Sequence, residues 1–140
     1  MRELRTSGSV GARRGNSPGY PTATVIVVRP VDGSHATVAL SAFLALARRL
    51  LQRIPKGHAD LVDQLRRDAQ SVPQNIAEGA GKTGRADKAR YYAIARGSAM
   101  ESAAYLDVMK IDELIGDEHY TVGVALLERV VAMLTRMIDL

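Results

Sequence analysis

The sequence predicts an all-α protein, an antiparallel up-down-up-down four-helix bundle with an irregular N-terminal tail. Apolar residues recur at steps of three and four over four separate stretches, and Pro or Gly separates most of these stretches. Aromatic residues make up only 4% of the 140 residues, so Ala, Leu, Val, Ile and Met must fill the core, and this composition favours helices. Short connections between amphipathic helices make neighbouring helices antiparallel.

The first two helices are expected over residues 36–54 and 59–79. Pro55 and Gly57 follow the first helix and end it. Pro73 lies inside the second helix and removes one backbone hydrogen bond, so we expect a kink there rather than a stop. The apolar positions are Leu40, Leu44, Ala47, Leu51 and Ile54 in the first helix, and Val62, Leu65, Ala69, Val72 and Ile76 in the second.

The third and fourth helices are expected over residues 84–110 and 117–139. A glycine-rich break precedes the third helix, with Thr83 as its expected N-cap, and Asp117 is the expected cap of the fourth. The third helix carries small residues that permit close approach of a neighbouring backbone: Ala89, Ala93, Gly97 and Ala104, with Met100 among them.

The last helix carries two adjacent apolar heptad stripes. One contains Leu126, Val130, Met133, Met137 and Leu140, and the other contains Leu127, Val131, Leu134 and Ile138. A four-helix monomer needs one apolar face on each helix, so the second stripe favours contact with another subunit. The alternative is one broad stripe buried in the chain's own core. We expect a homo-oligomer.

The composition changes near residue 33. Residues 1–33 are rich in Gly, Ser, Pro and Arg without an apolar period, which predicts a flexible tail, and Thr22–Val28 is a β-branched run that suits one short strand. Residues 34–140 form the predicted bundle. No stretch is long enough to span a bilayer, and the apolar run of the tail is too short for a signal peptide. The chain has no cysteine, which excludes disulfides and thiolate sites and fits the cytoplasm.

Charge is distributed unevenly along the chain, whose net charge is +4. Residues 48–96 hold eleven basic and five acidic residues, whereas residues 97–140 hold three basic and eight acidic residues. This asymmetry predicts either a surface that faces a polyanion or complementary faces that meet in an oligomer. The candidate nucleic-acid-binding residues lie near the start of the third helix and are Lys82, Arg85, Lys88 and Arg90. The N-terminus of a helix also favours anions.

No catalytic, metal or cofactor motif survives inspection. Gly79–Gly84 matches G-x-G-x-x-G, but a helix rather than a strand precedes it, and Ile76 occupies the place of the first glycine of a Walker motif. The three His residues have no ligand partner at metal-binding spacing. The sequence therefore predicts neither an enzyme nor a cofactor.

Polar residues on core-leaning stretches predict an internal hydrogen-bond network instead. Ser71 is one of these polar residues. A catalytic pair of Glu78 and Glu101 is the alternative to a structural network, and it is disfavoured because a buried Glu in a bundle more often pairs with Arg. Glu78 is expected to be buried, so its replacement by Ala is expected to destabilise the bundle by roughly 1–3 kcal/mol, because a buried polar partner is left unpaired. The alternative is a solvated Glu78 beside Gly79, for which the loss is near zero. The predicted network consists of Arg66, Asn75, Glu78, Arg96, Ser98 and Glu101.

Several motifs resemble the four-helix-bundle family that is also called the 23S ribosomal RNA intervening-sequence protein family. They are Leu61–Arg67, Ser71–Gly79, Ile94–Ser98 with Glu101, and Leu126–Arg136, and the resemblance covers about residues 38–140. Asp68 and Gln70 depart from the family pattern, which usually has small or apolar residues there.

The resemblance implies antiparallel four-helix bundles that assemble into homopentamers, most of them without an assigned activity. A relative is the accessory protein of diversity-generating retroelements, which implies RNA, DNA or a reverse transcriptase as partners. We therefore expect a non-enzymatic oligomeric module that binds nucleic acid, or a protein that processes it, through its basic surface. A protein–protein scaffold without nucleic-acid binding is the alternative. Among the aromatic residues, only Tyr91 and Tyr92 lie near the cations, so exposed aromatic residues for base stacking are lacking. Binding is therefore expected to be directed at the nucleic-acid backbone and sensitive to salt.

Overall fold

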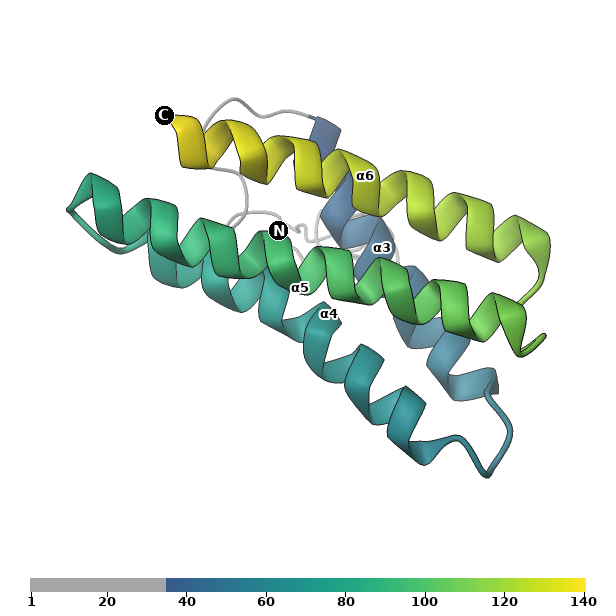
Figure 1. The fold of residues 1–140 in the computed structure, drawn as a ribbon. Coiled ribbons are helices and arrows are strands. Elements are labelled where there is room, and N and C mark those ends of the chain that lie inside the picture. The colour runs from purple at the N-terminus through teal and green to yellow at the C-terminus, as the bar shows by residue number, and fades with distance from the viewer. Residues whose placement is uncertain (1–34) are drawn as a thin grey trace, which may run out of the picture.

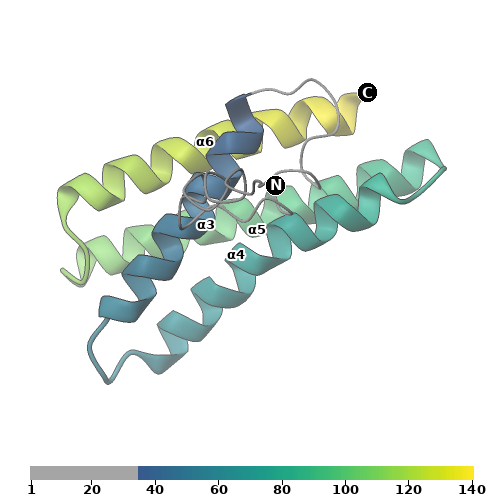
Figure 2. The same ribbon diagram turned by 180° about the vertical axis from the view of Figure 1, so that it is seen from behind.

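The computed structural model describes residues 35–140, with side chains from Val38 onward, as a bundle of helices that run alternately up and down (Figure 1). α4 packs against α5, α5 against α6, and α3 against both α4 and α6. This closed cycle of antiparallel neighbours, seen from behind in Figure 2, confirms the predicted all-α four-helix bundle, and the described residues contain no strand. The elements are α3 (His35–Arg53), α4 (Ala59–Ala80), α5 (Arg85–Ile111) and α6 (Asp117–Asp139).

The helix boundaries differ from the predicted ones by at most one residue, but the predicted caps are wrong. Gly84 rather than Thr83 is the N-cap of α5, and Gly116 rather than Asp117 is the N-cap of α6. Both glycines have extended backbone and provide no side-chain hydrogen bond. α4 continues through Pro73, as expected. Between α3 and α4, Gly57 has φ 106°, a left-handed conformation that glycine adopts without strain.

The core lies along the axis between the four helices. Leu40 and Phe43 from α3 and Leu106 and Met109 from α5 have no exposed surface, and the same holds for Leu65, Val72 and Ile76 on α4. These positions are those that the spacing of apolar residues assigns to the inner face of each helix. The buried core residues of α4 are therefore apolar residues whose spacing predicted that helix.

Both apolar stripes of α6 are largely covered within the one chain. Leu127, Val130, Met133 and Leu134 are buried, while Leu126, Val131, Met137 and Ile138 are partly buried and pack against the core. α6 lies between α3 and α5, so a broad apolar face meets two neighbours. The broad apolar face of α6 thus packs against the chain's own core, as the alternative interpretation has it, while the partly buried residues keep some exposed surface. The homo-oligomer stays a prediction. Only Leu140, at the end of the stripe, is mostly exposed.

Two further predictions concern the N-terminal tail and membrane-spanning segments. The predicted tail, residues 1–33, and its candidate strand Thr22–Val28 lie outside the described residues. Among the described helices, none combines the length and the apolar character that a membrane crossing requires.

Candidate functional site

The turn between α4 and α5 lies at one end of the bundle (Figure 1). At the end of α4 the backbone N–H groups of Gly81 and Lys82 donate to the carbonyls of Ala77 and Gly79, which closes the helix. α5 then begins at Arg85 without a side-chain cap. The turn is therefore short, and residues at the end of α4 lie close to those of the first turns of α5.

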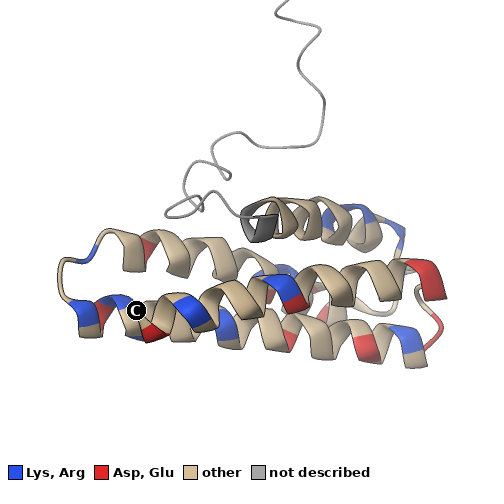
Figure 3. Ribbon diagram, turned by 90° about the horizontal axis from the view of Figure 1, so that it is seen from above, with Lys and Arg blue, Asp and Glu red and all other residues tan. Residues whose placement is uncertain are grey.

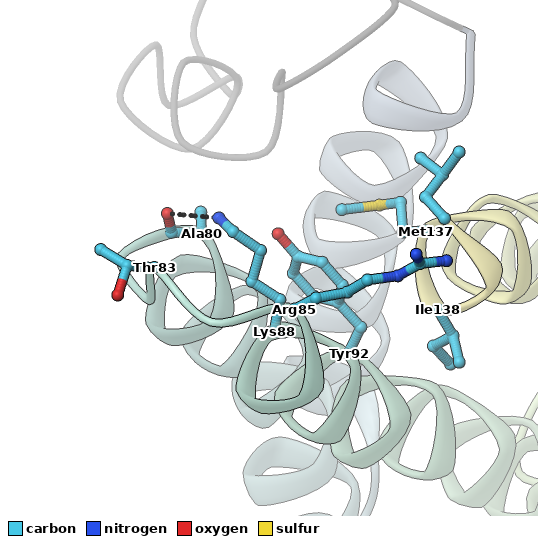
Figure 4. A pocket seen from close by; sticks show the side chains of 8 residues that line it. Ala80, Thr83, Arg85, Lys88, Tyr92, Met137 and Ile138 are labelled. Atoms are coloured by element: carbon cyan, nitrogen blue, oxygen red, sulfur yellow. Dashed lines mark hydrogen bonds between the residues drawn. The ribbon is translucent and has the colours of Figure 1, made fainter.

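Arg85 and Lys88, two of the four predicted cations, lie on the α6 side of this turn. The Arg85 guanidinium donates to the Asp139 carbonyl over 3.4 Å, and the Lys88 ammonium donates to the Ala80 carbonyl over 3.3 Å (Figure 4). Each cation therefore contacts the C-terminal end of a neighbouring helix, where the helix dipole favours positive charge.

Both cations line a pocket of about 380 Å³ that opens between α4, α5 and α6. Figure 4 shows the Tyr92 ring between Lys88, which points toward Ala80, and Arg85, which points toward α6. The Tyr92 ring lies against the backbone of α4, since a Cβ added at Gly79 would stand 2.7 Å from it. Burial raises the pKa of the Tyr92 hydroxyl. The lining residues are Ala80, Thr83, Arg85, Lys88, Tyr92, Met137, Ile138 and Leu140.

Lys82 and Arg90, the other two predicted cations, flank Tyr91. The Lys82 ammonium lies 5.2 Å and the Arg90 guanidinium carbon 5.5 Å from the centroid of the ring, within the range of cation–π attraction. Lys82 also forms an ion pair of 2.9 Å with Glu78, and that hydrogen bond raises the pKa of the Lys82 ammonium. The structure therefore brings all four predicted cations to one turn, but as two pairs.

Two members of the predicted polar network meet between α4 and α5. The Ser98 hydroxyl and the Asn75 amide both donate to the Ser71 hydroxyl oxygen, each over 2.9 Å, and the Ser102 hydroxyl donates to the Ser98 carbonyl. Ser98 and Ser102 are buried. These short side chains let the two helices approach closely while their polar atoms remain paired.

The other four members of the predicted network do not join it. Glu78 is 51% exposed, which corrects the expectation that it is buried. Glu78 lies two positions after the buried Ile76, which turns it about 200° around the helix and away from the core. Arg66 pairs with Asp63 on the surface, Glu101 is exposed, and Arg96 donates to the Thr135 hydroxyl of α6 over 3.2 Å.

Glu78→Ala is therefore expected to leave the melting temperature of the protein nearly unchanged. The side chain takes part in a surface ion pair, and such pairs contribute little to stability. A thermal melt followed by circular dichroism checks this expectation. A clear drop in the melting temperature would mean that Glu78 is buried after all, for example against another copy of the chain.

Asp68 is a partly buried carboxylate at a position where the sequence departs from the family pattern. Its Oδ2 atom is buried and has no hydrogen-bond partner among the described residues. Burial raises the pKa of this carboxyl, the nearby Glu101 raises it further, and Arg67 lowers it. The sequence marks Asp68 as a departure from the family pattern, but its burial was not predicted because an Asp on a helix is usually a surface residue.

A stripe of small and apolar residues on α5 faces away from the rest of the chain. We call it the outer face of α5, defined by Ala93, Gly97, Met100, Ala104 and Ile111. Their spacing of three, four and seven places them on one side of the helix. Met100 is 57% and Ile111 78% exposed, and a Cβ added at Gly97 would meet no atom within 4 Å. Ile94 and Val108, beside this face, are also exposed.

The two ends of the bundle differ in charge (Figure 3). Around the α4–α5 turn, the four cations outnumber the acidic Glu78, Asp87 and, at the end of α6, Asp139. At the opposite end, the acidic connection between α5 and α6 lies at the same end of the antiparallel bundle as the basic residues that close α3. The positive excess of the first half of the chain is thus balanced at that end and concentrated at the α4–α5 turn.

The comparisons with known proteins agree with this architecture. A search of curated proteins found no match. The model of one family, described as 23S rRNA-intervening sequence protein, matches residues 39–136, which include most of α3, all of α4 and α5, and α6 up to its last turn. The match spans the entire packed core and confirms the family that the motifs in α4 and α5 resemble, so the chain belongs to the 23S rRNA-intervening sequence protein family.

Proposed function

We propose that the chain is a non-enzymatic, homo-oligomeric helical-bundle module that binds nucleic acid through the α4–α5 turn. The observation that carries the proposal is the gathering of Lys82, Arg85, Lys88 and Arg90 around the α4–α5 turn, at one end of the bundle. Cations in such an arrangement contact phosphates and release counterions, so binding weakens steeply as salt rises. Phosphate contacts do not read sequence, and sequence discrimination is expected to be poor.

The outer face of α5 supports self-association. Exposed apolar residues in a continuous stripe on a small soluble domain mark an interaction surface. A glycine inside a helix is unfavourable by about 0.5–1 kcal/mol relative to alanine, and nothing in the chain's own packing requires Gly97. A helix of a second copy would approach closely at this glycine. The resemblance to the family makes a pentamer the expected assembly.

Self-association and nucleic-acid binding reinforce each other. A single α4–α5 turn offers few phosphate contacts, so one copy is expected to bind weakly. An oligomer presents the same turn several times, and linked contacts raise the overall affinity without any new interaction.

Reversing charge at the turn tests the proposal. We expect Arg85→Glu combined with Lys88→Glu to weaken binding to a labelled oligonucleotide at low salt by at least about tenfold, because two phosphate contacts become repulsive. The matched control is Arg48→Glu with Arg49→Glu, which makes the same change in net charge on two exposed residues of α3. Fluorescence anisotropy measures binding, after light scattering and circular dichroism have shown an intact assembly.

Equal losses in the two double variants would reduce the effect to net charge and contradict a site at the turn. A wild-type protein that binds neither RNA nor DNA at low salt would favour the alternative, a protein–protein scaffold whose interaction surface is the outer face of α5.

A further inference from the structure

Tyr91 differs in its surroundings from the other partly buried tyrosines among residues 38–140. Tyr105 and Tyr120 pack against the hydrophobic core, whereas the Tyr91 ring lies between two cations. Tyr91 stands beside the end of α4, where its Cβ would lie 3.1 Å from a Cβ added at Gly79. Its neighbour Tyr92 is only 6% exposed. Of the two aromatic residues at this turn, Tyr91 is therefore the more exposed.

Two cations from different parts of the chain converge on the Tyr91 ring. Lys82 belongs to the connecting turn and lies 5.2 Å from the centroid, while Arg90 belongs to α5 and lies 5.5 Å from it. Arg90 is exposed, and Lys82 retains 36% of its side-chain exposure despite its ion pair with Glu78. Neither cation is locked in place by burial, so both are free to turn toward a phosphate.

The relative strengths of two contacts decide what the ring binds when nucleic acid is present. At an exposed site, one cation–π contact changes an equilibrium by only about two- to fivefold. One nucleobase stacked on an aromatic side chain contributes about five- to 150-fold. A base is thus the stronger ligand for a face of the ring, and a cation displaced from that face remains next to the phosphate that follows the base.

We infer that Tyr91 is a stacking platform for an unpaired nucleobase, so that the ligand of the α4–α5 turn is a single-stranded nucleic acid. This inference rests on the proposed function and names its substrate class. Both faces of a base in a duplex are already stacked on neighbouring pairs, so a duplex offers only its phosphates to the four cations. Bases of a single strand are free to stack, and every base has a face that allows it.

The experiment compares binding of the full-length protein to single-stranded oligothymidylate, single-stranded oligouridylate and a DNA duplex of equal length, by fluorescence anisotropy at low salt. Tyr91→Leu is expected to weaken binding to both single strands by about tenfold and to change binding to the duplex by less than about twofold. Tyr91→Phe keeps a ring and is expected to bind as the wild type does. The matched control is Tyr105→Leu on the same helix, about 20 Å along its axis from Tyr91.

Each result has a distinct meaning. A selective loss on single strands in Tyr91→Leu, retained binding in Tyr91→Phe and no selective loss in Tyr105→Leu support the inference, whichever of the two single strands binds more tightly. Unchanged binding, or an equal loss on duplex and single strands, overturns the stacking role while the proposed function stands. A wild-type protein that binds none of the three probes overturns the proposed function and the inference with it.

Discussion

Ala104→Glu is expected to convert the proposed homo-oligomer into single chains of 15.1 kDa. Ala104 is exposed at the centre of the outer face of α5, so the single chain accommodates a glutamate there without repacking. In an assembly that buries this face, the same carboxylate would be buried without a partner. An uncompensated buried charge costs about 3–5 kcal/mol, which weakens association by roughly two to four orders of magnitude.

Ala125→Glu is the matched control for this variant. Ala125 is an exposed alanine of α6 and does not belong to the outer face of α5. The Ala125→Glu substitution is therefore expected to leave the assembly intact. Light scattering behind a sizing column measures the mass of each variant. If both variants keep the wild-type mass, the outer face of α5 is not the contact between copies.

Phe43→Ala is expected to destabilise the bundle by about 3–5 kcal/mol. Phe43 is the only Phe of the chain and is fully buried, and α3, which carries it, is the shortest of the four helices. Truncation removes an aromatic ring from the core and leaves a cavity that the surrounding residues fill only in part. The change is large enough to lower the melting temperature by more than ten degrees, at roughly 4 °C or more per kcal/mol in a domain of this size.

The control for this prediction is Val38→Ala on the same helix. Val38 is 60% exposed, and truncation of such a residue changes stability by less than about 0.5 kcal/mol. Thermal and urea unfolding compare the two variants. Similar unfolding of Phe43→Ala and Val38→Ala would contradict the packing of α3 by Phe43.

The helices were predictable because their signals are local. The steps of three and four that end near Ile54 and resume at Val62 define α3 and α4, and Pro55 and Gly57 mark the connection between them. The N-caps were not predictable in the same way. Gly84 and Gly116 occupy them through backbone conformation alone, whereas sequence reasoning looks for an adjacent hydroxyl or carboxylate.

The exposed apolar face of α5 was not predicted from the sequence, although its residues had been noticed. Counting stripes on α6 does not reveal that the helix lies between two neighbours, because that depends on the packing of the whole bundle. The small residues of α5 were interpreted as a close-approach surface, and the structure shows that most of them face away from the core. Spacing identifies a face, but only the fold shows what covers it.

The candidate site was predictable in part for the same reason. The sequence placed Lys82, Arg85, Lys88 and Arg90 near one helix start, and the structure brings them to one turn. The sequence did not show that two of these cations flank Tyr91 while the other two contact the ends of α4 and α6. Those contacts depend on the short turn between α4 and α5 and on the closeness of α6, neither of which has a periodic signal.

The most direct test of the oligomeric nucleic-acid-binding module is the mass of the full-length protein, mixed with a single-stranded oligonucleotide, by light scattering behind a sizing column at low and at high salt. The account predicts a particle whose protein mass is a multiple of 15.1 kDa at both salt concentrations and which carries nucleic acid only at low salt. A particle of one chain without nucleic acid at low salt would contradict it.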